Sequence, residues 1–274
     1  MSSRRLIAAA MATGLVALAA LAGVDEDLLL DATRYGSTPS KRAVKEKARA
    51  ELFSRGPDGL RLVMRHVHLE NVGVQGFAFE MVQELGARAA PVLVEFLGDE
   101  QALTRQLAAW YLGFGDTPEY AAPVLELLSD EKACGAAMRT LGKWRVRAAV
   151  PAILPFTRHE RETRRVVAIN ALRDIGDPAA IPALRDALND PFFTVREAAA
   201  RALASLGRPA EQALLRALPG AKGGVRRHMV RALGAMRSRR AAGALRKLFK
   251  AEDPFVREDA AEALDRIRGA RPVP

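Results

Sequence analysis

A leucine-centred pattern recurs along most of the chain at a nearly constant spacing, and this repeat limits the possible folds more than any other feature. The stretch VREAAARALASLG (195–207) aligns with VRRHMVRALGAMR (225–237) and VREDAAEALDRIR (256–268), and the same frame extends back to residue 44. Steps of 29 to 31 residues separate the members of one apolar slot, which are Leu52, Val82, Leu112, Leu141, Leu172, Leu203, Leu233 and Leu264. A period of this length indicates stacked structural repeats.

Each unit contains two short amphipathic helices. Around residue 195 the apolar residues Val195, Ala199 and Leu203 fall at helical spacing, and Gly207 follows where a helix commonly ends. A second apolar stretch follows, often through a proline, as in AIPALRDALND (180–190). Proline suits a first helical turn because its missing N–H would have no partner there. We call the helix with the Val-Arg pattern the first helix of a unit and the proline-containing helix the second.

The residues of the unit resemble a known family. The start Asp-Pro-x-x-Val-Arg-x-x-Ala-x-x-Ala-Leu and the Pro-Ala-Leu second helix are similar to HEAT-like repeats of the phycobilisome-lyase type, over residues 40–269. The resemblance implies an all-α fold, a right-handed α-solenoid of about eight two-helix repeats. It also implies first helices on the convex side and second helices on the concave side. It implies no chemistry, because this repeat serves many unrelated binding tasks.

The residues before the repeats are predicted to direct export. Residues 1–22 combine two arginines with an uncharged run and an Ala-Leu-Ala site, which is typical of a signal peptide. An uncleaved membrane anchor is the alternative, because the run approaches the ~20 residues that span a bilayer. Either reading predicts a periplasmic or extracellular protein, or one anchored in the membrane. Residues 23–39 are predicted to be a linker and residues 270–274 a short tail.

The sequence predicts no catalytic residue, cofactor or metal site. Cys134 is the only cysteine, so internal disulfides and cysteine-rich zinc sites are excluded, and we interpret it as a packing residue. HEAT-like enzymes of the deoxyhypusine hydroxylase kind bind a di-iron centre with several His-Glu pairs. This chain has one such pair, His159-Glu160, which we interpret as a polar turn because one pair supplies too few ligands.

Positive charge is concentrated in one unit. The whole chain has 42 lysine and arginine residues against 32 acidic ones, but residues 212–251 hold eleven basic residues and no acidic one. This block predicts a surface for an acidic protein partner or for anionic membrane headgroups. A solvated arginine-rich face without a partner is the alternative. The candidate binding residues are Arg226, Arg227, Arg239, Arg240, Arg246, Lys247 and Lys250.

The second helix of this basic unit has a predictable core stripe. Helical spacing in SRRAAGALRKLFK (238–250) places Ala241, Leu245, Leu248 and Phe249 in the core. The arginines and lysines between them would then point outward near the concave side.

Trp110 is the remaining candidate for a binding residue. Its slot in other units holds Arg139, Asn170, Arg201, Arg231 and Glu262, which is a solvent-facing series. An exposed tryptophan there would be a candidate binding anchor. We favour the alternative, a local register slip in the one unit with a 29-residue step, which would bury the ring.

These observations favour a non-enzymatic scaffold or adaptor in the cell envelope that mediates protein–protein interaction. One alternative is a nucleic-acid-binding protein like the HEAT-like DNA glycosylases, which bind duplex backbone with a basic face. Export would remove nucleic acid from the candidate partners. A lyase or lyase chaperone is a further alternative, suggested only by the name of the repeat family.

Overall fold

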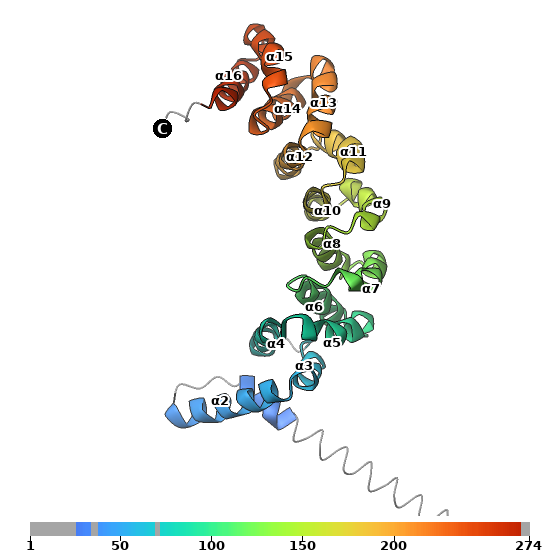
Figure 1. Cartoon of the computed structure of the whole chain (residues 1–274), viewed down its shortest axis with the longest axis vertical. Helices are drawn as coiled ribbons and strands as arrows, with labels where there is room; N and C mark the ends of the chain where they lie inside the picture. Colours follow the sequence, from blue (N-terminus) through green and yellow to red (C-terminus); the bar gives the residue numbers. More distant parts are fainter. Residues whose placement is uncertain (1–25, 34–37, 69–71, 270–274) are drawn as a thin grey trace, which may run out of the picture. The chain divides into compact units, whose positions relative to one another are not determined.

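A computed structural model describes residues 26–33, 38–68 and 72–269 of the chain, and all regular elements in these ranges are helices (Figure 1). The predicted all-α solenoid is therefore confirmed. The predicted signal segment 1–22 and the tail 270–274 lie outside the described residues.

The helices alternate between the two predicted types. The first helices are α2 (Pro39–Ser54), α4 (Val72–Leu85), α6 (Ala102–Leu112), α8 (Cys134–Lys143), α10 (Glu162–Ile175), α12 (Phe193–Ser205), α14 (Gly223–Ala235) and α16 (Pro254–Arg268). The second helices are α3 (Pro57–Met64), α5 (Ala90–Glu95), α7 (Ala121–Glu126), α9 (Val150–Ile153), α11 (Ile181–Ala187), α13 (Arg208–Ala217) and α15 (Ala242–Lys247). In the described ranges, none of the helices is both long enough and apolar enough to cross a bilayer.

The chain divides into two compact units, one up to Gly115 and one from Asp116 onward, where the sequence predicts a single solenoid. The predicted linker 23–39 contains a helical stretch, residues 26–33, in which Leu29 and Ala32 are buried. Both units keep the repeat core. All eight residues of the apolar slot are buried, with at most 4% of each exposed, from Leu52 to Leu264.

The pairing of the helices differs from the pairing that the sequence frame implies. In the second unit each of α7, α9, α11 and α15 packs more extensively against the first helix that follows it than against the one that precedes it. The exception is α13, which is shared between α12 and α14. The structural hairpin therefore consists of a second helix and the next first helix.

The expectation about the two sides of the solenoid is wrong. Within the second unit the first helices lie on the inner side of the bend and the second helices on the outer side (Figure 1). The cause is close packing between first helices. A Cβ at Gly142 would lie 3.0 Å from the Cα of Ala171, and one at Gly234 would lie 2.7 Å from the Cβ of Ala263. Small residues let these helices approach closely, which shortens the inner row.

Replacing Gly234 with valine should therefore destabilise the second unit. The added side chain would overlap the backbone of α16, and overpacking of this kind costs about 1 to 3 kcal/mol. The matched control is Gly224→Ala in the same helix, because nothing lies within 4 Å of a Cβ at that position. Urea unfolding should show a lower midpoint for the valine variant and no loss for the control. Equal midpoints for the two variants would contradict the close approach.

The recurring arginine of the Val-Arg pattern has a structural role. Arg105, Arg165, Arg196 and Arg257 each donate from Nη1 to two backbone carbonyls of the loop that precedes their helix, at 2.7 to 2.9 Å. These bonds satisfy carbonyl groups that the loop itself leaves without partners. The arginine thus fixes the loop inside the hairpin, between a second helix and the first helix that follows it.

Candidate interaction surface

The basic unit exposes its charged side chains because a few small and apolar residues anchor its short second helix. Ala241 and Leu245 are fully buried, and the Ser238 side chain accepts a hydrogen bond from the backbone N–H of Ala241 at 3.1 Å. This anchoring leaves the rest of the segment on the surface. Exposed basic residues lie on η9 (Arg239–Ala241), α15 and η10 (Leu248–Lys250), namely Arg239, Arg240, Arg246, Lys247 and Lys250.

Phe249 does not belong to the core, contrary to the predicted stripe. Its side chain is 47% exposed, and Leu248 is only partly buried. The reason is the change to a 3-10 turn after Lys247, because three residues per turn rotate the following side chains out of the α-helical stripe. An aromatic ring therefore lies exposed in the middle of the basic residues.

Some of the predicted binding residues are bound within the protein. Arg227 and Arg231 donate to the carboxylate of Asp259 on the next first helix, at 2.6 and 2.8 Å. Asp259 is buried, its hydrogen bond raises the pKa of Arg227, and the Arg227 guanidinium also lies 4.8 Å from the centre of the Phe255 ring. On η9, Arg240 pairs with Glu211 at 3.6 Å. Three of the eleven charges are thus compensated, which corrects the expectation of an uncompensated block.

Arg226 is the remaining predicted residue on α14. It is partly buried, and its Nε has no hydrogen-bond partner among the described residues. It is therefore less accessible to a partner than the residues on α15.

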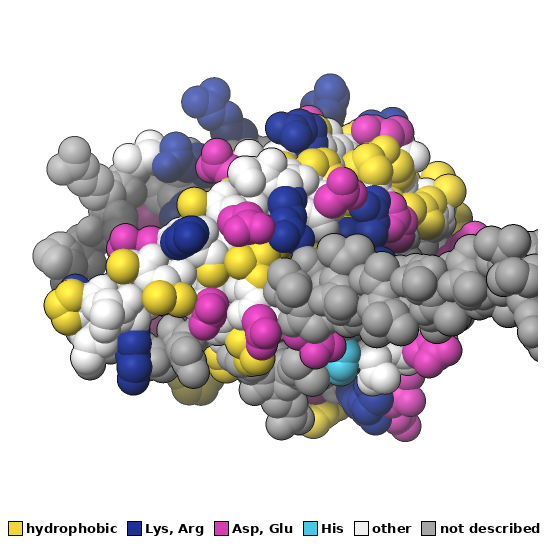
Figure 2. Space-filling view, turned by 90° about the horizontal axis from the view of Figure 1, so that it is seen from below, with side chains coloured by type: hydrophobic (Ala, Val, Ile, Leu, Met, Phe, Trp, Pro, Cys, Tyr) yellow, Lys and Arg dark blue, Asp and Glu magenta, His cyan; other side chains and the backbone are white. Residues whose placement is uncertain are grey.

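The other basic side chains form a surface without acidic partners. We define the basic surface as the exposed side chains Arg216, Lys222, Arg237, Arg239, Arg246, Lys247 and Lys250. Within the ranges that the structure describes, none of them is paired with an acidic residue. Arg216, Arg246 and Lys247 lie on second helices, and Arg239 and Lys250 lie on the 3-10 turns that flank α15. The second helices form the outer side of the bend, not the predicted concave side (Figure 1). On the face drawn in Figure 2, by contrast, positive and negative side chains are interspersed.

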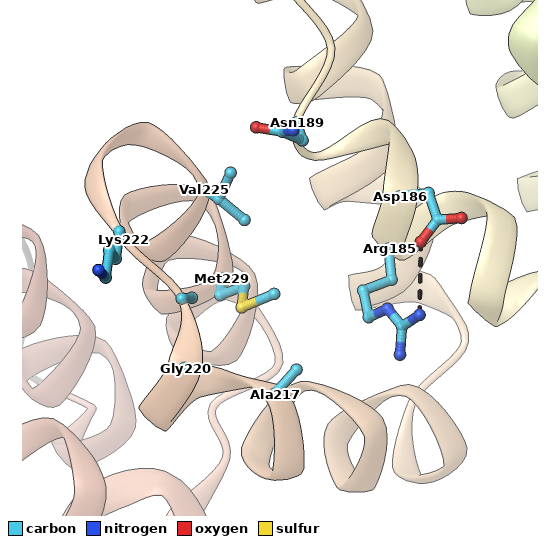
Figure 3. A pocket seen from close by; sticks show the side chains of 9 residues that line it. Arg185, Asp186, Asn189, Ala217, Gly220, Lys222, Val225 and Met229 are labelled. Carbon is cyan, nitrogen blue, oxygen red and sulfur yellow. Dashed lines mark hydrogen bonds and ion pairs between the residues drawn. The ribbon is translucent and has the colours of Figure 1, made fainter.

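An open groove of about 600 Å³ adjoins the basic surface between α11, α13 and α14 (Figure 3). It lies beside α13, the second helix that is shared between two first helices. Ala217, Val225 and Met229 provide its apolar lining. The polar lining residues are Arg185, Asp186, Asn189 and Lys222.

Trp110 is exposed, so the favoured register slip is wrong. The residue is 38% exposed on α6, while Ala109 and Leu112 beside it are buried. Its ring stacks on Phe79 with centroids 5.8 Å apart and meets Phe114 edge-on at 5.1 Å. This aromatic cluster belongs to the first unit and is therefore separate from the basic surface of the second.

The sequence offers Cys134 and the pair His159-Glu160 as residues that could carry chemistry. Cys134 is buried, as expected for a packing residue, and burial raises the pKa of its thiol. The Nδ1 atom of His159 accepts a hydrogen bond from the backbone N–H of Arg161 at 3.0 Å, which fits the predicted polar turn. Among the described residues, no three histidine, cysteine or acidic side chains lie close enough together to hold a metal ion.

Sequence reasoning missed the role of His228. This residue is 5% exposed, and its Nε2 accepts a hydrogen bond from Nε of Arg196 at 3.1 Å. Burial, followed by the charges of Arg196 and Arg231, lowers the pKa of the imidazole, which favours the neutral form that can accept this bond. A signal was present, because the equivalent slot in the next unit holds Asp259, another acceptor for arginine.

Comparison with known families gives one clear match. The sequence pattern of HEAT repeats matches residues 129–204, 150–222 and 211–274, which together cover more than half of the chain. None of the curated proteins matches the chain.

Comparison with solved structures gives matches at low sequence identity. YibA of Escherichia coli is 17% identical with a TM-score of 0.50, and the match covers 85% of this chain and 88% of that one. The complex of CpcE and CpcF of phycocyanin lyase from Nostoc sp. PCC7120 is 21% identical with a TM-score of 0.44, covering 77% and 94%. Human deoxyhypusine hydroxylase is 20% identical with a TM-score of 0.38, covering 93% and 99%. The likeness extends to the fold alone.

Proposed function

Because the chain belongs to the HEAT repeat proteins, we propose that it is a non-enzymatic scaffold that binds an acidic protein partner through its basic surface. HEAT repeats mediate protein interactions in many settings, and the repeat itself carries no chemistry. The observation that carries the proposal is the set of seven exposed basic side chains without acidic partners in the described part of the chain. Like charges gathered in this way repel one another, and an anionic partner relieves that repulsion.

An acidic protein fits this surface better than a membrane. The exposed Phe249 ring among the basic residues provides an apolar contact of the kind that is common at the centre of protein interfaces. The basic residues come from separate helices and turns rather than from one flat face, and one of them, Lys222, also lines a groove. Anionic headgroups remain the competing class of partner for the test.

The test is the triple charge reversal of Arg246, Lys247 and Lys250 to glutamate. The probe is a short fluorescent peptide of glutamate and serine, and the readout is fluorescence anisotropy at low and moderate salt. We expect the triple variant to bind at least about tenfold more weakly, and the affinity of the unaltered protein to fall with salt.

The control is the triple reversal of Lys132, Arg139 and Arg147, three exposed basic residues of the same unit outside the basic surface. It changes the net charge equally, so an equal loss of binding in both variants would show a nonspecific charge effect and refute the proposal. The proposal would also be refuted if the protein did not bind the peptide but sedimented with phosphatidylserine vesicles. That result would indicate a membrane partner.

We further propose that the scaffold works in the cell envelope, exported or tethered by residues 1–22. The basic start, the apolar run and the Ala-Leu-Ala site of that segment support this location. A reporter enzyme that is active only after export, fused to residues 1–40, should become active in the envelope of a bacterial host. A reporter that stays inactive, while the same enzyme is active behind a known signal peptide, would refute the location.

A further inference from the structure

We infer that the groove between α11, α13 and α14 receives an apolar side chain that stands between acidic residues of the bound partner segment. This inference rests on the proposed function and adds to it the kind of segment that is selected. It assigns recognition of charge to the basic surface and recognition of an apolar residue to the groove.

The base of the groove is apolar. Ala217 comes from the end of α13, and Val225 and Met229 come from the first turns of α14, so two helices contribute to one lining (Figure 3). Met229 is only 4% exposed and therefore forms the bottom of the groove. A volume of about 600 Å³ exceeds that of a single leucine side chain, so the groove can also admit backbone.

The rim of the groove is positive. Lys222 belongs both to the groove lining and to the basic surface, and Arg185 faces it from α11. The one acidic lining residue, Asp186, is already paired with Arg158 at 2.9 Å and with Arg185 at 3.4 Å. Asp186 shares its charge between two arginines, so a carboxylate beside the inserted apolar residue would meet Lys222, which has no acidic partner in the described part of the chain.

The turn between α13 and α14 borders the groove. It consists of η8 (Leu218–Gly220) with Ala221 and Lys222, and α14 begins at Gly223. Gly220 and Gly224 carry no side chains, and nothing lies within 4 Å of a Cβ at either position. A partner backbone can therefore approach the rim without meeting side chains of the turn.

The experiment compares two fluorescent peptides that are equally acidic and differ at one central residue, leucine in one and serine in the other. The unaltered protein should bind the leucine peptide at least about tenfold more tightly, as expected for burial of one apolar side chain. Ala217→Phe, which fills the groove, should remove this preference and leave the serine peptide's affinity unchanged. Gln212→Phe, on an exposed position of the same helix, is the control and should keep the preference.

The outcomes separate this inference from the proposed function. If both peptides bind equally well to the unaltered protein, or if the preference survives Ala217→Phe, the inference is wrong and the basic surface stands. If neither peptide binds, the proposed function fails as well. If circular dichroism shows that Ala217→Phe has lost its helical structure, Ala217→Lys is used instead, because its flexible side chain also fills the groove. This variant too must abolish the preference for the leucine peptide.

Discussion

Replacing Asp190 with alanine is expected to lower the free energy of unfolding of the second unit by about 3 to 5 kcal/mol, because it leaves a buried arginine without its counter-charge. Arg165 holds Asp190 with two contacts, Nε to Oδ2 at 2.7 Å and Nη2 to Oδ1 at 3.0 Å. The exposed fractions of the two side chains are only 9% and 10%. Asp190 also accepts a hydrogen bond from the backbone N–H of Phe192 at 2.9 Å.

Two further variants separate the ion pair from this backbone hydrogen bond. Asp253 makes a similar bond as the N-cap of α16, accepting from the N–H of Phe255 at 2.9 Å, but it is not paired with a buried arginine. Asp253→Ala should therefore cost only about 1 kcal/mol. The double variant Arg165→Met with Asp190→Leu should recover much of the loss, since no charge is then buried alone. Equal losses for Asp190→Ala and Asp253→Ala in urea unfolding would show that the pair contributes nothing.

Replacing Leu203 with alanine should cost about 2 to 5 kcal/mol, because it opens a cavity in the repeat core. Leu203 is fully buried on α12, which packs against α10, α11 and α14. The cavity cannot close by a shift of one helix without disturbing the others.

The matched comparison is Phe249→Ala, which removes a larger side chain from an exposed position. If the structure is right, this change should alter the free energy of unfolding by no more than about 0.5 kcal/mol. Phe249→Ala tests the predicted core stripe of the basic unit, and Leu203→Ala gives the loss expected for a buried residue. A loss from Phe249→Ala as large as the loss from Leu203→Ala would return Phe249 to the core, as the sequence predicts.

The sequence predicts the repeat core well and the pairing of its helices poorly, for a physical reason. Burial of the leucine slot can be predicted from the repeat period and the helical spacing, because both are present in the sequence of each unit. The first helix that a second helix packs against cannot be predicted in this way, because a repeating pattern has no marked beginning. Whether α11 belongs with α10 or with α12 depends on side-chain packing across a turn. The inner position of the first helices depends likewise on contacts such as that between Gly234 and Ala263.

The candidate surface was predicted in part. Its basic residues form a run without acidic neighbours in the sequence. The pairing of Arg231 with Asp259 cannot be seen there, because Asp259 lies 28 residues further on, on the next first helix. Phe249 was misplaced because the sequence does not mark the change from an α-helical to a 3-10 turn. The groove is lined by residues of three helices, which are spread from Arg185 to Met229 in the sequence, so the local pattern does not predict it.

The contact of first helices through glycine and alanine has a mechanical consequence for the second unit. Where backbone already touches side-chain Cβ atoms, tighter curling of the arc would compress atoms at once. Straightening of the arc would only separate small side chains, at little cost per ångström. The unit should therefore be stiff in one direction and compliant in the other, and a partner seated on its outer side would meet a surface that flattens more readily than it arches.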